Sequence, residues 1–266
     1  LPAMSFAYQG LAWDTRIREM DADSLDGLPA GLADRDYHFI DLYGEGLPGI
    51  LAEQEQGWYY KRNQGGGRFG APALIAARPF TGEVSDIRDL QGDTEKYLAD
   101  LDGDAPGFYR LDGRAWGAFQ SFPTLPHIDF AGAGTRAIDL DGDGRADFLV
   151  DDDRTFLSYL SEGRDGFTLG RRFAKGFDEE KGPRLIFADP EQTIFSADMS
   201  GDGLTDIVRV RNGSVCYWPN LGYGRFGAKV TMEASPFLDH PDQFSPARVR
   251  LADVDGSGPA DLLYIG

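Results

Sequence analysis

The 266-residue sequence contains one cysteine, Cys216, and three histidines, His38, His127 and His240. A single cysteine excludes an internal disulfide, and its apolar, alternating surroundings favour a small core residue over a thiolate nucleophile. None of the histidines lies in a recognisable frame with a nucleophile. No zinc-ligand spacing and no phosphate-cradling glycine loop is present either. We therefore expect a protein that is not an enzyme.

The sequence also lacks long apolar runs and has few basic residues. No segment has the uninterrupted apolar length of a membrane span or the profile of a signal peptide, so we expect no direct membrane insertion and no signal within this segment. There are 26 Lys and Arg residues against 44 Asp and Glu residues, which gives a formal net charge of -18. This balance argues against nucleic-acid binding, because that function needs basic stripes.

Glycine is abundant, with 35 residues, and it recurs among carboxylates. In residues 139–147, aspartates occupy positions 1, 3, 5 and 9. Glycines allow the positive φ of a tight turn, and Ca²⁺ takes six to eight oxygen ligands at about 2.3–2.6 Å. A helical calcium hand needs an acidic ligand at position 12, but Val150 stands there, at the end of a short apolar run typical of a strand. The segment therefore predicts a calcium loop in a β-hairpin.

The same pattern recurs along the chain. Two more loops carry oxygen at positions 1, 3, 5 and 9, and position 7 of each loop is expected to add a backbone carbonyl. The three predicted Ca²⁺ sites consist of Asp139, Asp141, Asp143, Arg145 and Asp147; Asp198, Ser200, Asp202, Leu204 and Asp206; and Asp253, Asp255, Ser257, Pro259 and Asp261. The alternative is a set of Asp/Gly-rich turns that bind no ion, in which aspartates cap their own backbone amides.

Two further segments are weaker copies of the loop. Asp100, Asp102 and Asp104 keep positions 1, 3 and 5, but Phe108 stands at position 9, so a weaker site is predicted there. Residues 41–49 keep the turn and lose most ligands. The five nine-residue loops hold 15 acidic residues and one basic residue, so about -14 of the net charge is concentrated in them. Such loops would repel themselves without cations, which favours bound ions.

The loops start near residues 41, 100, 139, 198 and 253, and this period suits one four-stranded sheet per repeat. We predict an all-β fold, a β-propeller of four-stranded blades with acidic calcium-type hairpin loops and about five visible blades, in one domain of residues 1–266. A β-sandwich is the alternative, but it does not explain the period. The last unit contains only two strands. Either N-terminal strands complete the ring or, as we favour, the chain is part of something longer.

Residues 41–51, 216–227 and 251–264 resemble, in this order, the middle region of bacterial toxin-complex B subunits, the SpvB/TcdB-like insecticidal toxin family. The resemblance extends over most of the chain, whereas the acidic loops alone are shared with FG-GAP and VCBS repeats. It implies a seven-bladed propeller within a larger, secreted or host-associated subunit. That propeller docks on the pore-forming A subunit and gates a shell, formed with the C subunit, that holds a toxic enzyme.

Protein partners are therefore expected, and an aromatic-rich turn is where one could bind. The candidate partner-binding residues are Trp218, Tyr223, Arg225 and Phe226, although we favour Trp218 and Phe226 as wedges between neighbouring sheets. Two other functions stay open. One is a calcium-stabilised adhesion or carbohydrate-binding propeller of the integrin type, and the other is a hydrolase centred on the ring channel.

Overall fold

The computed structural model describes residues 16–27, 37–54, 57–75, 77, 79, 81, 85–102, 104–152, 154–168, 170–176, 178–183 and 193–265. Within this part of the chain, regular structure is almost all β-strand. The described helices are the short α1 (Ala22–Leu25) and two 3₁₀ turns, Gly163–Asp165 and Pro246–Arg248. None of them has the length and apolar character needed to cross a bilayer.

Four antiparallel sheets share one plan, in which each strand pairs with the next along the chain. The first two consist of β1 (Tyr37–Ile40), β2 (Gly49–Gln54), β3 (Gly57–Lys61) and β4 (Ala73–Leu74), and of β5 (Ser85–Arg88), β6 (Tyr97–Asp100), β7 (Gly107–Asp112) and β8 (Ala115–Trp116), with β9 (Gln120–Ser121) also paired to β7. The next two consist of β10 (Thr135–Ile138), β11 (Asp147–Asp152), β12 (Thr155–Tyr159) and β13 (Arg172–Ala174), and of β14 (Ile194–Ala197), β15 (Asp206–Arg211), β16 (Ser214–Trp218) and β17 (Val230–Met232). A fifth sheet pairs β18 (Val249–Ala252) with β19 (Asp261–Tyr264).

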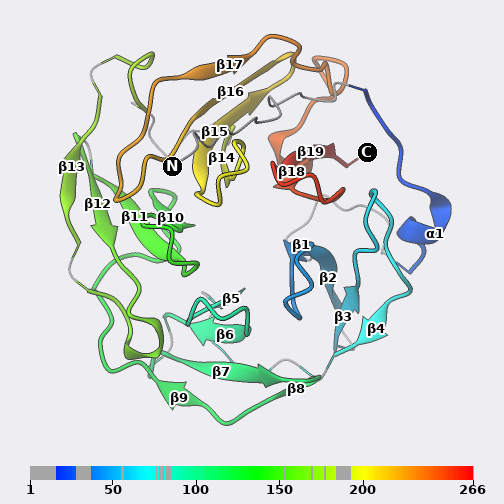
Figure 1. The fold of residues 1–266 in the computed structure, drawn as a ribbon. Helices are drawn as coiled ribbons and strands as arrows, with labels where there is room; N and C mark the ends of the chain where they lie inside the picture. The colour runs from blue at the N-terminus through cyan, green and yellow to red at the C-terminus, as the bar shows by residue number, and fades with distance from the viewer. Residues whose placement is uncertain are drawn as a thin grey trace, which may run out of the picture.

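The sheets stand around a common axis, with the first strand of each nearest the centre (Figure 1). This arrangement confirms the predicted all-β propeller, and the β-sandwich alternative is wrong. Four sheets are full blades, and the two-stranded sheet occupies a fifth position between the fourth and the first.

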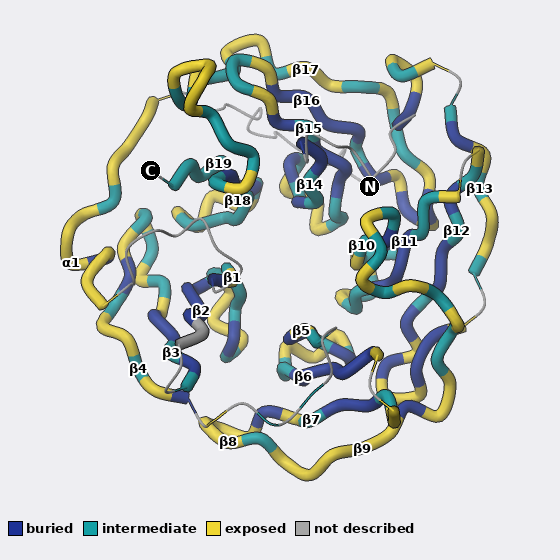
Figure 2. Tube along the Cα trace, turned by 180° about the vertical axis from the view of Figure 1, so that it is seen from behind, coloured by how far each residue is buried: buried dark blue, intermediate teal, exposed yellow. Residues whose placement is uncertain are grey.

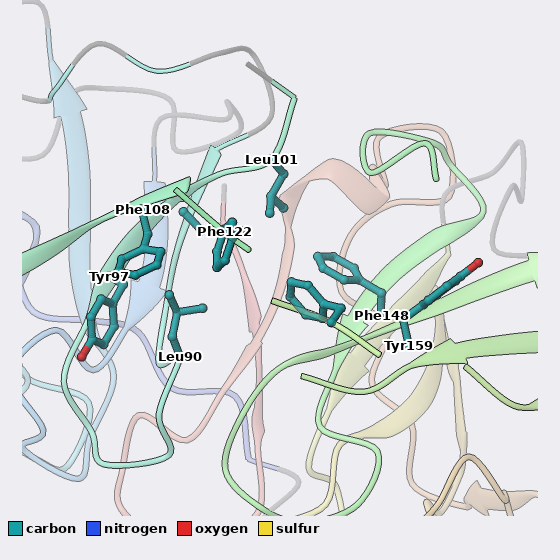
Figure 3. Packing of buried hydrophobic residues seen from close by; sticks show 9 residues of the cluster. Leu90, Tyr97, Leu101, Phe108, Phe122, Phe148 and Tyr159 are labelled. Carbon is teal, nitrogen blue, oxygen red and sulfur yellow. The ribbon is translucent and has the colours of Figure 1, made fainter. Parts of the chain in front are cut away.

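A separate hydrophobic cluster fills each gap between neighbouring sheets. Between the second and third sheets, Tyr97, Phe108 and Phe122 face Phe148 (Figure 3). The ring centroids of Phe122 and Phe167 lie 6.3 Å apart across this junction. The buried segments follow the middle strands of the four full sheets (Figure 2), so the core is divided among the junctions rather than gathered on the axis.

Neighbouring residues on one strand enter different clusters, because successive side chains of a strand point to opposite faces. Phe148 packs toward the second sheet, whereas Leu149 packs toward the fourth. Ile207 and Val208 divide in the same way between the third and fifth sheets. The middle strands are therefore buried on both faces, which explains their continuous apolar runs.

The fifth sheet returns to the first. Val254, in its β18–β19 loop, packs against the cluster that contains Tyr37 and Phe69 of the first sheet and its following turn. The Val254 carbonyl also accepts bonds from Asn63 Nδ2 and Gly67 N, both at 3.2 Å. The described contacts therefore close over five sheets, and these sheets do not form the seven-bladed ring that the resemblance implies. Residues 1–15, one expected source of closing strands, lie outside the described residues.

A matched pair of leucine substitutions tests this division of the core. Leu149 is fully buried between two sheets, so Leu149→Ala should lower the free energy of unfolding by about 2–5 kcal/mol through lost burial and a residual cavity. Leu74 is 53% exposed, so Leu74→Ala should change stability by less than about 0.5 kcal/mol. Urea unfolding measures both, and equal effects would contradict the described packing.

Candidate functional site

Five loops connect the first and second strands of the five sheets, and they lie at one end of the ring. We call them the loop ring: residues 41–48, 89–96, 139–146, 198–205 and 253–260. The fourth residue of each loop is a glycine with positive φ. A Cβ built on it would come within 2.5–3.2 Å of the next loop, in the pairs Gly44 and Thr94, Gly92 and Asp143, Gly142 and Leu204, Gly201 and Pro259, and Gly256 and Leu47. The loops therefore touch one another in a closed circuit.

The second loop is not where the sequence placed it. It starts at Asp89, so the starts at 41, 89, 139, 198 and 253 are 48, 50, 59 and 55 residues apart. Asp100 is the last residue of β6, and Asp102 and Asp104 follow in the connection to β7, at the opposite end of that sheet. The assignment of these three residues to the repeated loop is wrong, because the local pattern of alternating acids was stronger there than at Asp89.

The first aspartate of each loop binds the loop's own backbone. The Asp139 carboxylate accepts bonds from Gly142 N at 2.7 Å and Gly144 N at 2.9 Å. The other four first aspartates likewise accept at least two backbone amides of their own loops, and one of these is always the amide five residues on. They are Asp41 and Asp89, whose loops lack most predicted ligands, and Asp198 and Asp253. Capping of backbone amides, the alternative to ion binding, is therefore present in every loop at this position.

The aspartate at position 9 ties the loop to the rest of its sheet. Asp147 accepts Leu140 N at 3.0 Å and Ser161 N at 2.7 Å. Burial raises the pKa of Asp147 to about 7 and that of Asp206 to about 6, although their backbone donors act in the opposite direction. The charged form is therefore costly at these positions, and a nearby cation would offset the cost.

Among the residues that the structure describes, two groups of carboxylates come close enough together to hold a metal ion. One carboxylate oxygen from each of Asp139, Asp141 and Asp147 lies within 4.8 Å of the others. Asp253, Asp255 and Asp261 of the fifth sheet form an equivalent group. Burial, followed by repulsion from Asp143, raises the pKa of Asp141, and its buried Oδ1 has no hydrogen-bond partner. These donors fit Ca²⁺, which prefers clustered carboxylate oxygens.

The other predicted ligands are used differently. The Asp143 carboxylate accepts bonds from Arg145, from its backbone N at 2.9 Å and from Nε at 2.7 Å, and so lies outside the close group of its loop. In the fourth loop, the Ser200 hydroxyl lies 3.4 Å from Asp198 Oδ1 and donates to it. Asp202 accepts Leu204 N at 2.9 Å. Metal binding through Arg145, Leu204, Ser257 and Pro259 stays a prediction.

The candidate partner-binding residues divide into two buried and two exposed side chains. Trp218 is fully buried, and its Nε1 donates to the Glu179 carbonyl at 2.7 Å. Phe226 is half-buried and packs edge-on against Phe156, with centroids 6.4 Å apart. Both therefore act as wedges between sheets. Tyr223 and Arg225 are exposed, and they remain candidates for a partner contact.

Two asparagines join neighbouring sheets through side-chain hydrogen bonds, and the sequence analysis did not predict them. Asn220 Nδ2 donates to the carbonyls of Asp139 at 3.0 Å and Thr205 at 3.2 Å. Asn63 Nδ2 makes the equivalent bonds to Pro48 and, as described above, Val254. The sequence does carry a pattern that could have pointed to these asparagines, because residues 63–70 and 220–227 share Asn, Gly, Gly, Arg, Phe and Gly at the same spacing.

Among the described contacts, no histidine lies against Cys216 as a base beside a nucleophile. All three histidines are exposed. His240 Nδ1 lies 3.7 Å from Asp242 Oδ2, but both side chains are mostly solvated. Cys216 is buried, and this burial raises the pKa of its thiol, which disfavours the reactive thiolate.

No protein-family model and no curated protein sequence matches the chain. Solved structures do match it, and this β-propeller is similar to part of a Tc toxin. A mutant Tc holotoxin pore from Photorhabdus luminescens is 28% identical, with a TM-score of 0.65 over 92% of this chain. The chain spans 11% of the length of that protein.

Two further structures are more distant. A crystal structure of TcdB2-TccC3 without its hypervariable C-terminal region is 18% identical, with a TM-score of 0.50, and the match covers 91% of this chain and 14% of that one. At this identity the likeness shows the fold alone. A lectin from Agrocybe aegerita that recognises non-reducing terminal N-acetylglucosamine is 21% identical over 85% of this chain and 59% of its own, but its TM-score of 0.46 is too low to support an argument.

The reassigned second loop yields a test of the capping role. Asp89 accepts Gly92 N at 2.7 Å and Thr94 N at 2.6 Å, so Asp89→Ala should lower the free energy of unfolding by about 0.5–1.5 kcal/mol through the loss of these solvent-exposed hydrogen bonds. Asp104→Ala lies in the segment that the sequence pattern predicts to be this loop, and it should change the free energy of unfolding by less than about 0.5 kcal/mol because Asp104 is exposed. If chemical unfolding showed a larger loss of stability for Asp104→Ala than for Asp89→Ala, the reassignment would be refuted.

Proposed function

We propose that the chain is a non-enzymatic structural and interaction module of a bacterial toxin-complex B-type subunit. The module docks on the pore-forming subunit and helps to gate a shell that encloses the toxic enzyme. The observation that supports this proposal is the similarity to a Tc holotoxin pore, at 28% identity and a TM-score of 0.65 over 92% of the chain. As part of such a complex, the module acts after secretion or in association with a host.

The geometry suits a docking role. Five sheets joined by five clusters and a closed loop ring make a rigid platform, and rigid platforms bind with little loss of conformational entropy. The net charge of -18 gives this platform a strong field that steers a partner of opposite charge.

Calcium is proposed as a structural cofactor of the loop ring. Asp139, Asp141 and Asp147 would hold one ion, and the equivalent second group in the fifth sheet would hold another. A bound Ca²⁺ would supply positive charge to carboxylates whose mutual repulsion and burial otherwise disfavour the folded hairpin. The unpartnered, buried Oδ1 of Asp141 is the feature that favours an ion over a simple turn.

Docking is testable with the intact chain. Immobilised chain should bind a purified Tc pore-forming subunit saturably in biolayer interferometry. The affinity should fall as NaCl increases from about 0.05 to 0.5 M, because salt screens the attraction between opposite charges. A β-propeller of similar net charge without likeness to Tc toxins is the control. Absence of saturable binding at every salt concentration would refute the docking proposal.

The calcium proposal requires a response that depends on the close carboxylates. Ca²⁺ at about 100 times its Kd should stabilise the chain by about 2.7 kcal/mol per site, because it binds only the folded state. The double variant Asp141→Asn/Asp255→Asn should lose this rise in Tm, since it removes one carboxylate from each group. In EDTA it should melt at or above the unmodified chain, because the first aspartates still cap their hairpins.

A loop without the close group is the control for this experiment. Asp93→Asn lies in the second loop, where Gln91 and Tyr97 replace the carboxylates of positions 3 and 9, so it should keep the full response to Ca²⁺. Differential scanning calorimetry in Ca²⁺ and in EDTA measures each variant. Identical melting of the unmodified chain in both buffers would remove the calcium assignment.

A further inference from the structure

The turn between β16 and β17, residues 220–226, exposes two apolar side chains at the end of the ring that carries the loops. Leu221 is 56% exposed and Tyr223 is 58% exposed. The turn is held firmly, because Tyr223 N donates to the Leu140 carbonyl at 2.5 Å and Asn220 Oδ1 accepts Gly222 N at 2.9 Å. The two side chains therefore project from a fixed backbone.

The chain contains its own comparison for this turn. Isolated bridges join the first and seventh residues of three equivalent turns, which are Asn63 and Phe69, Ser161 and Phe167, and Asn220 and Phe226. At the positions of Leu221 and Tyr223, the other turns have the pairs Gln64 and Gly66, and Glu162 and Arg164. The first turn forms with a polar residue and a glycine at these positions, so folding of the turn does not require an apolar pair.

Tyr223 also occupies a costly backbone conformation. Its φ is 54°, in the left-handed region, where the equivalent Gly66 has a φ of 64°. A residue with a Cβ loses about 1–2 kcal/mol in this region, whereas glycine does not. A tyrosine that is mostly exposed recovers little of this cost by burial within the chain. Its side chain is therefore better explained by a contact outside the chain.

We propose that Leu221 and Tyr223 form a docking knob for the pore-forming subunit, and that the knob enters an apolar pocket whose border carries both acidic and basic side chains. The identification of the occupant rests on the proposed function. The chemistry of its pocket follows from the surroundings of the knob, which lies beside the third and fourth loops. Asp202 in the fourth loop and Arg225 in the turn itself are exposed, whereas Asp143 in the third loop is paired with Arg145, so a border with charges of both signs is complementary. Tyrosine is an effective anchor because it offers a large apolar ring with a polar tip.

The knob can be removed by transplanting the residues of the first turn. The double variant Leu221→Gln/Tyr223→Gly should weaken binding to the purified pore-forming subunit by about tenfold or more, as expected for loss of a central anchor. Its Tm should be unchanged or higher, because glycine relieves the left-handed φ. Leu74→Gln is the control. Leu74 is similarly exposed, at 53%, but lies in the outer strand β4, so this variant should bind the pore-forming subunit as tightly as the unmodified chain.

Tyr223→Asn provides a second variant whose residue tolerates a positive φ, so the test survives if the double variant unfolds. It should weaken binding while Tm is kept. Folded variants that bind as tightly as the unmodified chain would overturn the knob and leave the proposed function standing. Equal weakening by Leu74→Gln would also overturn the knob, because the effect would then not be local. Failure of the unmodified chain to bind the pore-forming subunit would overturn both proposals.

Discussion

The structure depends on middle strands that are apolar on both faces. Phe148 and Leu149 are adjacent on β11, yet each is buried against a different neighbouring sheet. Full burial of one such side chain contributes about 1.5–3 kcal/mol, so a sheet with only one neighbour would leave much of this stabilisation unused. A row of such sheets has two unsatisfied ends, and a ring has none. The cluster around Tyr37 and Phe69 closes that ring by packing with Val254.

The loop ring adds a second layer to this closure. In every loop the first aspartate accepts backbone amides, whereas the ninth position varies. In the first sheet that residue is Gly49, and the Tyr60 hydroxyl accepts Leu42 N at 3.3 Å in place of a carboxylate. The space fits this exchange, since a Cβ on Gly49 would lie 2.4 Å from the Tyr60 oxygen. Hairpin geometry is thus retained by different chemistry, which separates the structural role of a loop from its capacity to bind a cation.

The second loop shows where reasoning from the sequence fails. Asp100, Asp102 and Asp104 match the repeated pattern better than Asp89 does. The loop at Asp89, however, joins the first and second strands of its sheet, as the other four loops do, whereas Asp100 ends the second strand, which pairs onward with the third. Loop identity depends on which strands are adjacent in the sheet, and a run of nine residues contains little information about that.

Trp218 was correctly favoured as a wedge, because an aromatic residue at the end of an alternating strand is most stable when buried.

The sequence by itself determined the fold class and four of the five acidic hairpin loops, because turn chemistry and apolar runs are local properties. Only the tertiary structure decided which carboxylates converge, which side chains remain exposed and where the circuit of sheets closes. Asn63 and Asn220 act between sheets, and the partners of their side chains lie 191 and 81 residues away along the chain. Contacts of this kind follow from the packing of whole blades, and no local pattern specifies them.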